Sequence, residues 1–484
     1  MTKHLVVIGA GPAGEAVAKG AARRGARVTV VERADVGGVC LNHGCIPSKV
    51  LLESGRLLSH TRSAKFLGSP HLPKDWAVLQ AHKNDLVSRF RNALEQRLAQ
   101  LKVSVRRGTA RFVGPRQIEV SGPDGLDVLD FDAAVIATGA RPFFPPPFDA
   151  LTEKIVTTQP SSGPSGHLPP RGEGNPGFPS PLGRGQGEGP EQLQKILDSD
   201  RVLEIPRVPS RLVVVGGGAV GLEFACLFQE WGSAVTVIEK KEQILPGEDT
   251  AVVRCLQTIF EKRGMTVLTE TTVTQAATGP AGWRLSLSNG QNVEAEEVLV
   301  CVGRRPVSDG LGLEAAGVIA DRGRVVVNEF FQTSQPHIYA AGDVNGLSLL
   351  AHAAWAQGDA IAGHWAGEKT AYSSALVPRC LYTWPEVASV GEWSGTVKNA
   401  KTQRFFFQGS AKALATEEGE GFIQIVSDKE SGRLLGAQII GPKATELIHI
   451  FSVALKGAMT AKDLRDVIFA HPTLAEGVRE ALDR

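Results

Sequence analysis

Residues 5–14 read LVVIGAGPAG, and this stretch decides the fold of the first part of the chain. A short apolar run rich in β-branched residues, Leu5 to Ile8, leads directly into a GxGxxG pattern and then into an alanine-rich stretch. The glycines of the pattern are Gly9, Gly11 and Gly14. A second β-branched run, Val28 to Val31, ends in Glu32. This order predicts a strand, a helix and a parallel strand, with glycines that let the backbone approach a pyrophosphate and a carboxylate for ribose hydroxyls.

The same pattern returns in the middle of the chain. A strand-like run from Leu212 to Val215 is followed by three glycines, an apolar helix to Trp231 and a second run from Val235 to Ile238 that ends in Glu239. These glycines are Gly216, Gly218 and Gly221. In both copies the acid stands at the same distance from the first glycine, so the sequence predicts two dinucleotide folds and two bound dinucleotides.

Between the two copies, residues 37–49 read GGVCLNHGCIPSK and contain Cys40 and Cys45. In a regular α-helix, residues five apart have Cα atoms about 8.7 Å apart, which exceeds the limit of roughly 7 Å for a disulfide. A bridge between the two cysteines therefore requires a distorted helix, and Gly44 and Pro47 are residues that permit one.

A cysteine pair of this kind can serve as metal ligands, as a structural bridge or as a redox pair. Zinc sites need further ligands at characteristic spacings, and no second Cys/His cluster of that form follows in the sequence. A bridge that closes so small a loop stabilises little. Because a helix N-terminus lowers the pKa of a thiol, the position of the pair favours redox chemistry.

Length and composition limit the remaining possibilities. A chain of 484 residues suggests three or four domains, and a net charge of +1 leaves no electrostatic footprint for nucleic acid or a membrane surface. No apolar run reaches membrane-spanning length, and the N-terminal run is best read as a buried first strand. Of the other four cysteines, which are Cys226, Cys255, Cys301 and Cys380, we expect Cys226 and Cys301 to lie in the core.

The rest of the chain divides by composition. A helix is predicted from Trp76 to Leu101, and three short strands between Val103 and Val135. Residues Gln159 to Pro190 are rich in Pro, Gly and Ser and predict a disordered surface insertion. Beyond Gly367 the pattern becomes α+β, with strands near 421–427 and 434–440 and a helix near 443–457.

Residues 37–49 closely resemble the redox helix of the flavin-dependent disulfide oxidoreductases, and CIPSK resembles the dihydrolipoamide dehydrogenase branch. Further segments resemble family motifs in family order, and these are ATG at 137–139, VGRRP at 302–306, TSQPHIYAAGD at 333–343, AH at 351–352 and HPTLAE at 471–476. The resemblance covers the chain except for the insertion.

The resemblance implies an α/β fold class with two Rossmann-like domains, for FAD and NAD, and a C-terminal α+β dimerisation domain. The expected division is 1–150 for the FAD domain, 151–200 for a linker with the insertion, 201–300 for the NAD domain, 301–368 for a central domain that completes the FAD site, and 369–484 for the interface. It further implies a cytoplasmic homodimer that acts on dihydrolipoamide carried by a lipoyl domain of a 2-oxoacid dehydrogenase or glycine cleavage complex. No metal, nucleic acid or membrane partner is expected.

The resemblance also implies residue roles. Cys40 is the interchange thiol, Cys45 the thiolate that faces the flavin, His471 the base and Glu476 the group that orients it. Lys49 and Glu223 match an ion pair beside the isoalloxazine ring. The cofactor-binding residues are expected to be Gly9, Gly11, Gly14, Glu32, Lys49, Ala110, Thr138, Gly139, Asp343, Ala351, Gly216, Gly218, Gly221, Glu223, Glu239, Val273 and Gly303.

Several positions depart from the family pattern. His43 replaces an apolar or aromatic residue, and Ala219 and Val220 occupy places where bulkier residues often cover the flavin. Glu239 favours NAD⁺ over NADP⁺, whereas Lys240 and Lys241 are contrary evidence. The alternatives are another disulfide or quinone reductase of the same fold, and a weakly active flavoprotein subunit of a complex.

Overall fold

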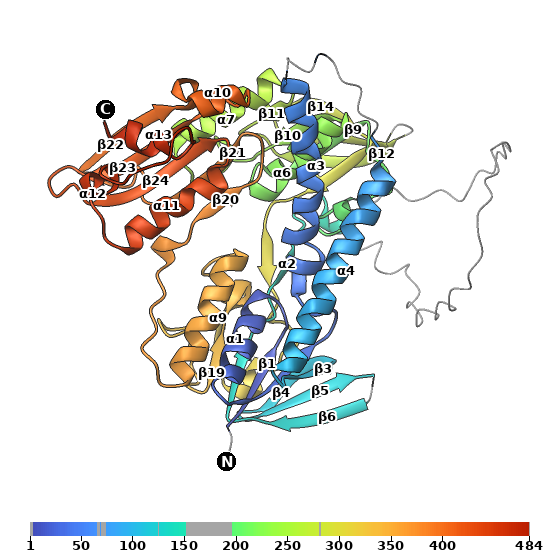
Figure 1. Cartoon of the computed structure of the whole chain (residues 1–484). Helices are drawn as coiled ribbons and strands as arrows, with labels where there is room; N and C mark the ends of the chain where they lie inside the picture. The colour runs from blue at the N-terminus through green and yellow to red at the C-terminus, as the bar shows by residue number, and fades with distance from the viewer. Residues whose placement is uncertain are drawn as a thin grey trace, which may run out of the picture.

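The computed structural model describes residues 3–64, 68, 74–123, 125–151, 196–279 and 282–483 (Figure 1). The predicted insertion, Gln159 to Pro190, lies outside the described residues.

The first nucleotide unit is the predicted strand, helix and strand with additional elements around them. Its five-stranded parallel sheet has the order β19-β7-β1-β2-β3. The strands are β1 (His4–Ile8), β2 (Arg27–Glu32), β3 (Ser104–Arg107), β7 (Ala133–Ile136) and β19 (Ile338–Ala340). All residues of β1, β7 and β19 are buried, as expected for a parallel sheet covered on both faces.

Two helices from distant parts of the chain pack together on this sheet, α1 (Pro12–Arg23) and α9 (Ala351–Trp365) (Figure 1). Small residues let them approach closely. A Cβ atom added at Gly358 would lie 2.6 Å from the Ala13 carbonyl oxygen, and one at Gly20 would lie 2.7 Å from Ala362 Cβ. The first unit is therefore assembled from two separate pieces of sequence.

Two long helices follow the cysteine stretch. They are α3 (Cys45–Ser63) and α4 (Trp76–Gln100), which contact each other, and α2 (Gly38–Asn42) precedes them. The Asp75 side chain accepts a hydrogen bond from the Val78 N–H and caps α4, whose bounds confirm the predicted helix.

The region from 103 to 135 differs from the prediction of three strands, because it contains five. Between β3 and β7 lies an antiparallel meander of β4 (Thr109–Gly114), β5 (Gln117–Gly122) and β6 (Gly125–Asp130). The loops between these strands are only two residues long, so short strands run into each other in the sequence and their boundaries are hidden.

The second nucleotide unit repeats the plan of the first. Its parallel sheet has the order β11-β10-β9-β15, formed by β9 (Arg211–Val215), β10 (Ala234–Ile238), β11 (Thr266–Leu268) and β15 (Glu297–Val300), with helices α6 (Ala219–Trp231) and α7 (Thr250–Lys262). An antiparallel meander of β12 (Val273–Gly279), β13 (Gly282–Leu287) and β14 (Asn292–Ala295) adjoins it. Cys226 on α6 is buried in the core as predicted, and Cys301 packs against the same core just after β15.

The strands β8 (Ala140–Pro142) and β16 (Arg304–Pro306) pair where the chain passes between the two units. The 3₁₀ helix η2 (Arg201–Glu204) packs in the core of the second unit. The other short elements pack on the first unit, and they are α8 (Leu313–Ala316), the hairpin β17 (Ala320–Asp321) and β18 (Arg324–Val325), and the 3₁₀ helix η3 (Gly342–Asn345).

The C-terminal domain is an antiparallel sheet with helices on it, red in Figure 1, and it packs beside the second unit. The sheet order is β20-β21-β24-β23-β22, with β20 (Arg379–Leu381), β21 (Glu386–Gly391), β22 (Ala400–Phe406), β23 (Phe422–Asp428) and β24 (Leu434–Gly441). Its helices are η4 (Ser374–Leu376), η5 (Phe407–Gly409), α10 (Ala411–Ala415), α11 (Ala444–Lys456), α12 (Ala461–Arg465) and α13 (Glu476–Leu482). The α+β pattern predicted for this region is confirmed.

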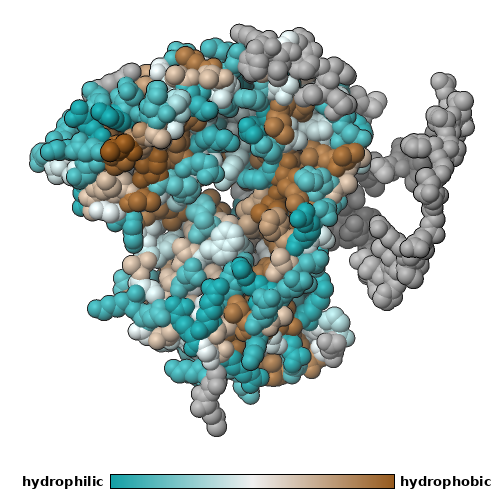
Figure 2. Space-filling view, viewed as in Figure 1, coloured by the Kyte–Doolittle hydropathy of each residue, from teal (hydrophilic) through white to brown (hydrophobic). Residues whose placement is uncertain are grey.

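Hydrophobic side chains reach the surface over the C-terminal domain and along α3 and α4 (Figure 2). In the C-terminal domain Ile468 is 96% exposed, and Val453 on α11 is also exposed. Contiguous apolar surface of this kind is typical of a protein–protein contact. Within the described part of the chain, every helix is too short or too polar to cross a bilayer.

Candidate active site

The helix that holds the two cysteines is broken between them. α2 ends at Asn42 and α3 begins at Cys45, and Gly44 between them has φ −149° and ψ −112°. A Cβ atom at Gly44 would lie 2.9 Å from the Val39 carbonyl oxygen, so glycine is needed for close packing. The predicted distortion is therefore present at Gly44, whereas Pro47 lies in the first turn of α3, where a missing N–H is tolerated.

The two thiols are electrostatically unequal. Both cysteines are free, and a hydrogen bond from Cys40, assisted by the charge of Lys49 and opposed by burial, lowers the pKa of Cys45 to about 7. The same hydrogen bond and burial raise the pKa of Cys40. This asymmetry favours Cys45 as the thiolate and Cys40 as the thiol that donates to it.

The cysteines open into a cavity of about 550 Å³ that also reaches the N-terminus of α1 and the end of β2. The cavity is lined by both cysteines and by many of the predicted cofactor residues, namely Gly9, Gly11, Glu32, Lys49, Ala110, Thr138, Gly139, Glu223, Asp343 and Ala351. His43 and Val220, two of the departures from the family pattern, line it as well.

The polar groups that line this cavity fit an elongated dinucleotide. At one end, the Glu32 carboxylate accepts hydrogen bonds from the N–H groups of Ala10 at 2.7 Å and Ala34 at 2.9 Å, which fixes it at the strand end. The glycine turn then presents the helix N-terminus, which favours a pyrophosphate. A Cβ atom at Gly139, which has φ +70°, would meet no atom within 4 Å, so the wall stays open there.

The second nucleotide unit reproduces this geometry. Glu239 accepts from the N–H groups of Gly217 at 2.7 Å and Lys241 at 2.8 Å. The third glycine of each pattern packs in the same way, because a Cβ atom at Gly14 would lie 1.9 Å from the Gly9 carbonyl oxygen and one at Gly221 would lie 2.2 Å from the Gly216 carbonyl oxygen.

Several predicted cofactor residues do not line the large cavity. They are Gly14, which packs behind the first turn, and Gly216, Gly218, Gly221, Glu239, Val273 and Gly303. Val273 begins β12 and is buried in the core of the second unit, and Gly303 follows β15 with φ +129°. Apart from Gly14, the structure therefore separates the predicted cofactor residues into one set around the cysteine cavity and one set in or next to the second unit.

Lys49 and Glu223 form the predicted ion pair. Lys49 Nζ lies 2.8 Å from Glu223 Oε2, and the Glu223 side chain is only 8% exposed. The pair joins α3 to α6 at the wall of the cavity. A fixed cation beside a redox site stabilises negative charge that develops there.

His471 and Glu476 also form a pair. His471 Nδ1 lies 2.8 Å from Glu476 Oε1, and Glu476 Oε2 accepts from the Thr473 N–H at 2.7 Å. These two interactions lower the pKa of Glu476, with the backbone contribution the larger. The His471 side chain is 78% exposed and does not line the cysteine cavity. Within one chain, therefore, the structure does not bring His471 and the cysteines together.

Arg304 is a cavity residue that the sequence reasoning did not single out. It donates to the Ala140 carbonyl oxygen at 2.8 Å and to Ser199 Oγ at 3.0 Å, so it ties β8 to the segment before η2. Burial raises the pKa of Asp343, and the nearby charge of Arg304 opposes that rise. The sequence feature that could have indicated Arg304 is the arginine pair in VGRRP, at the point where the chain returns from the second unit to the first.

The chain resembles known proteins over its whole length. Residues 3–358 match a family model described as pyridine nucleotide-disulphide oxidoreductase, and residues 377–482 match the dimerisation domain of that family. The dihydrolipoyl dehydrogenase of Thermus scotoductus is 37% identical over 494 residues, covering 100% of this chain and 97% of the relative. That of Bacillus subtilis strain 168 is 35% identical, covering 99% of this chain and 97% of the relative.

A solved structure with the same architecture is the crystal structure of LpdA from Mycobacterium tuberculosis. It superposes with a TM-score of 0.85 at 26% sequence identity, covering 100% of this chain and 99% of that chain.

Proposed function

The chain belongs to the pyridine nucleotide-disulphide oxidoreductase family, and from this membership we propose that it is a dihydrolipoyl dehydrogenase, which oxidises dihydrolipoamide to lipoamide with NAD⁺. The observation that carries the proposal is the pair of thiols across a helix break, in a dinucleotide-shaped cavity with a fixed ion pair in its wall. Full-length relatives named dihydrolipoyl dehydrogenase support this specificity.

FAD and NAD are the cofactors, and the two nucleotide units supply matching sites. We assign FAD to the large cavity, with Glu32 toward its ribose, the turn at Gly9 to Gly14 toward its pyrophosphate and Asp343 toward its ribityl chain. When bound, FAD would accept the two electrons released as the reduced Cys40/Cys45 pair returns to its disulfide, and would supply a hydride to NAD⁺. We assign NAD to the second unit, where the fixed carboxylate of Glu239 repels a 2′-phosphate.

The chemistry at sulfur follows from the unequal thiols. In the oxidised protein Cys40 and Cys45 are joined by a disulfide. His471 removes the proton from one thiol of dihydrolipoamide, and the resulting thiolate attacks the Cys40 sulfur. A mixed disulfide forms, and Cys45 leaves as the thiolate that its lowered pKa stabilises. The second substrate thiol then attacks the substrate sulfur of the mixed disulfide, which releases lipoamide and the Cys40 thiol.

The His471–Glu476 and Lys49–Glu223 pairs place charged groups where these proton and electron transfers occur. Glu476 accepts a hydrogen bond from Nδ1 of His471, which orients the ring and leaves Nε2 to take the substrate proton. Lys49 places a positive charge near Cys45 and the cavity, where negative charge develops after the thiolate leaves.

The assembly is proposed from the same family membership. The dimerisation domain at 377–482 and its exposed apolar residues support a homodimer. We propose that the substrate arrives on a lipoyl domain of a 2-oxoacid dehydrogenase or glycine cleavage complex, and that the protein works in the cytoplasm, where thiols stay reduced. The five-part domain division predicted from the sequence remains part of this proposal.

Turnover with purified holoenzyme tests the proposal. We expect reduction of NAD⁺ by dihydrolipoamide, and its loss in Cys40→Ser with bound FAD and NADH-dependent quinone reduction retained. A flavin-loaded wild-type enzyme that reduces quinones but never turns over dihydrolipoamide would instead identify a quinone reductase. A flavin-loaded protein with neither activity would identify a weakly active subunit of a complex.

A further inference from the structure

Tyr382, which directly follows β20, touches both members of the Lys49–Glu223 ion pair. Its ring centroid lies 4.6 Å from Lys49 Nζ, and its backbone N–H donates to Glu223 Oε1 at 3.0 Å. The other carboxylate oxygen of Glu223 binds Lys49. Lys49 and Glu223 line the cysteine cavity and Tyr382 does not, so these two contacts connect Tyr382 to the site through the pair.

The chain next to Tyr382 is anchored on the helices that carry this pair. The Trp384 side chain is 9% exposed, and its indole N–H donates to Glu230 Oε1 of α6 at 3.3 Å. Its ring packs on α3 at Gly55, where an added Cβ atom would lie 2.6 Å from the indole. We call residues 382–384 the bridging strip, because they connect the C-terminal domain to both α3 and α6.

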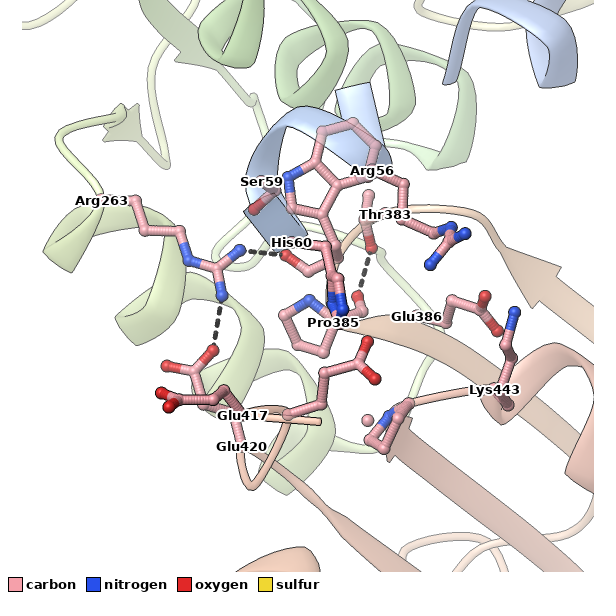
Figure 3. A pocket seen from close by; sticks show the side chains of 14 residues that line it. Arg56, Ser59, His60, Arg263, Thr383, Pro385, Glu386, Glu417, Glu420 and Lys443 are labelled. Carbon is pink, nitrogen blue, oxygen red and sulfur yellow. Dashed lines mark hydrogen bonds and ion pairs between the residues drawn. The ribbon is translucent and has the colours of Figure 1, made fainter. Parts of the chain in front are cut away.

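The bridging strip is also held from its other side. At the end of α7, Arg263 donates to the Trp384 carbonyl oxygen and to Glu420, each at 2.5 Å (Figure 3). Thr383 Oγ1 donates to the Pro385 carbonyl oxygen at 2.7 Å, and these residues line a small pocket of about 60 Å³ with side chains of α3. The backbone position of Tyr382 is therefore set by contacts with three helices.

An aromatic ring held in this way restricts a flexible cation. The Lys49 side chain is partly exposed, and without a ring its ammonium group could turn toward water. The negative face of the ring attracts the ammonium and keeps it beside Glu223. Lys49 is one of the groups that lower the pKa of Cys45, so the ring position affects the electrostatics of the thiolate.

We propose that Tyr382 is a positioning residue that holds the Lys49 ammonium at the cavity wall, so that the C-terminal domain sets the electrostatics of the redox site in the first nucleotide unit. The inference rests on the proposed redox use of Cys45.

The test measures the Cys45 thiolate directly in FAD-loaded Cys40→Ser protein. The rate of alkylation of Cys45, identified by peptide mass, is followed against pH, and its midpoint reports the pKa. We expect Tyr382→Leu to raise the midpoint by about half a unit, from the usual strength of a cation–π contact. Tyr382→Phe should leave it unchanged, since the aromatic face remains.

Two further variants separate the ring electrostatics from packing. Progressively fluorinated phenylalanines at position 382 keep the shape but weaken the negative face, so the midpoint should rise stepwise. Trp393→Leu is the matched control, because it removes a ring that lies 5.4 Å from the Arg379 guanidinium in the same domain but outside the cavity. Its midpoint should equal that of the parent protein.

The proposal is overturned if the midpoint of Cys45 alkylation does not change along the fluorinated series, or if it is unchanged in folded Tyr382→Leu. It is also overturned if Tyr382→Phe shifts the midpoint as much as Tyr382→Leu does. If Tyr382→Leu does not fold, the fluorinated series decides. None of these measurements uses dihydrolipoamide. Absence of dihydrolipoamide turnover would therefore contradict the proposed function while the alkylation series still decides the role of Tyr382.

Discussion

The pKa values of Cys40 and Cys45 differ mainly because of the hydrogen bond between the two thiols. This hydrogen bond shifts the pKa of each thiol more than burial or the charge of Lys49 does. A side chain at position 40 that can donate a hydrogen bond should therefore keep the thiolate at Cys45, and one that cannot donate should not.

This gives a prediction for two variants of position 40. In Cys40→Ala the donor is lost, so the pKa of Cys45 should rise from about 7 and less thiolate should be present at neutral pH. Alkylation of Cys45 at pH 7 should slow by several fold, whereas Cys40→Ser, which keeps a donor, should change much less. Equal alkylation rates in the two variants would contradict the assigned hydrogen bond. The other cysteines serve as internal controls, because burial raises the pKa of Cys226, Cys255, Cys301 and Cys380.

His471 leads to a second prediction for a single residue. His471→Gln should lower kcat for dihydrolipoamide by about 10²- to 10⁴-fold, the usual contribution of a general base. Glu476→Gln should lower it less, because the amide can still accept a hydrogen bond from His471 Nδ1 and hold the ring in place. NADH-dependent quinone reduction needs neither residue and is the control. A fall in both activities would show damage to the fold rather than loss of a base.

Among the helices and strands, the glycine turns were the most predictable part of the chain. The bounds of β1, α1 and β2 follow from the change between strand and helix periodicity around Gly9, and those of β9, α6 and β10 follow in the same way around Gly216. The contacts of Tyr382 and Trp384 could not be predicted, because both depend on a domain that folds back over α3 and α6. The contacts of Arg304 could not be predicted either, because its partners, Ala140 and Ser199, are far from it in the sequence.

The repeated turn gives a matched pair of tests. Gly14→Ala forces a Cβ atom against the Gly9 carbonyl oxygen, and Gly221→Ala forces one against the Gly216 carbonyl oxygen. The first variant should purify with little flavin. The second should keep its flavin and its reduction by dihydrolipoamide, but the KM for NAD⁺ should rise at least tenfold. Flavin absorbance and steady-state kinetics measure the two effects, and loss of flavin in Gly221→Ala would contradict the assignment of the cofactors to the two units.

For the molecule as a whole, the domain arrangement keeps His471 away from the cysteine cavity of its own chain. The cysteines belong to the first nucleotide unit and His471 closes the C-terminal domain, with an exposed side chain and exposed apolar residues nearby in sequence. In a twofold dimer, the same surface of each chain meets its copy, so each chain can supply His471 to the other.

Mixed dimers test this arrangement. Cys40→Ser should be inactive with dihydrolipoamide and His471→Gln nearly so, and the two variants are unfolded and refolded together with FAD. If the sites are shared, a mixed dimer has one site with both lesions and one site with neither, so up to about half of the wild-type activity per mixed dimer should return. Mixed dimers that are isolated by two affinity tags and remain inactive would exclude a shared site. Each variant refolded alone is the control.

The packing of α9 on α1 and the pairing of β19 with β7 also determine when the first unit can be completed. The strands of the second unit all lie between residues 211 and 300, whereas β19 begins at Ile338 and α9 ends at Trp365. On a translating ribosome, the second unit is therefore available for folding before the first sheet has its last strand. A chain that terminates before Ile338 lacks β19 and α9 and cannot form the complete sheet of the flavin unit, although all strands of the second unit have been made.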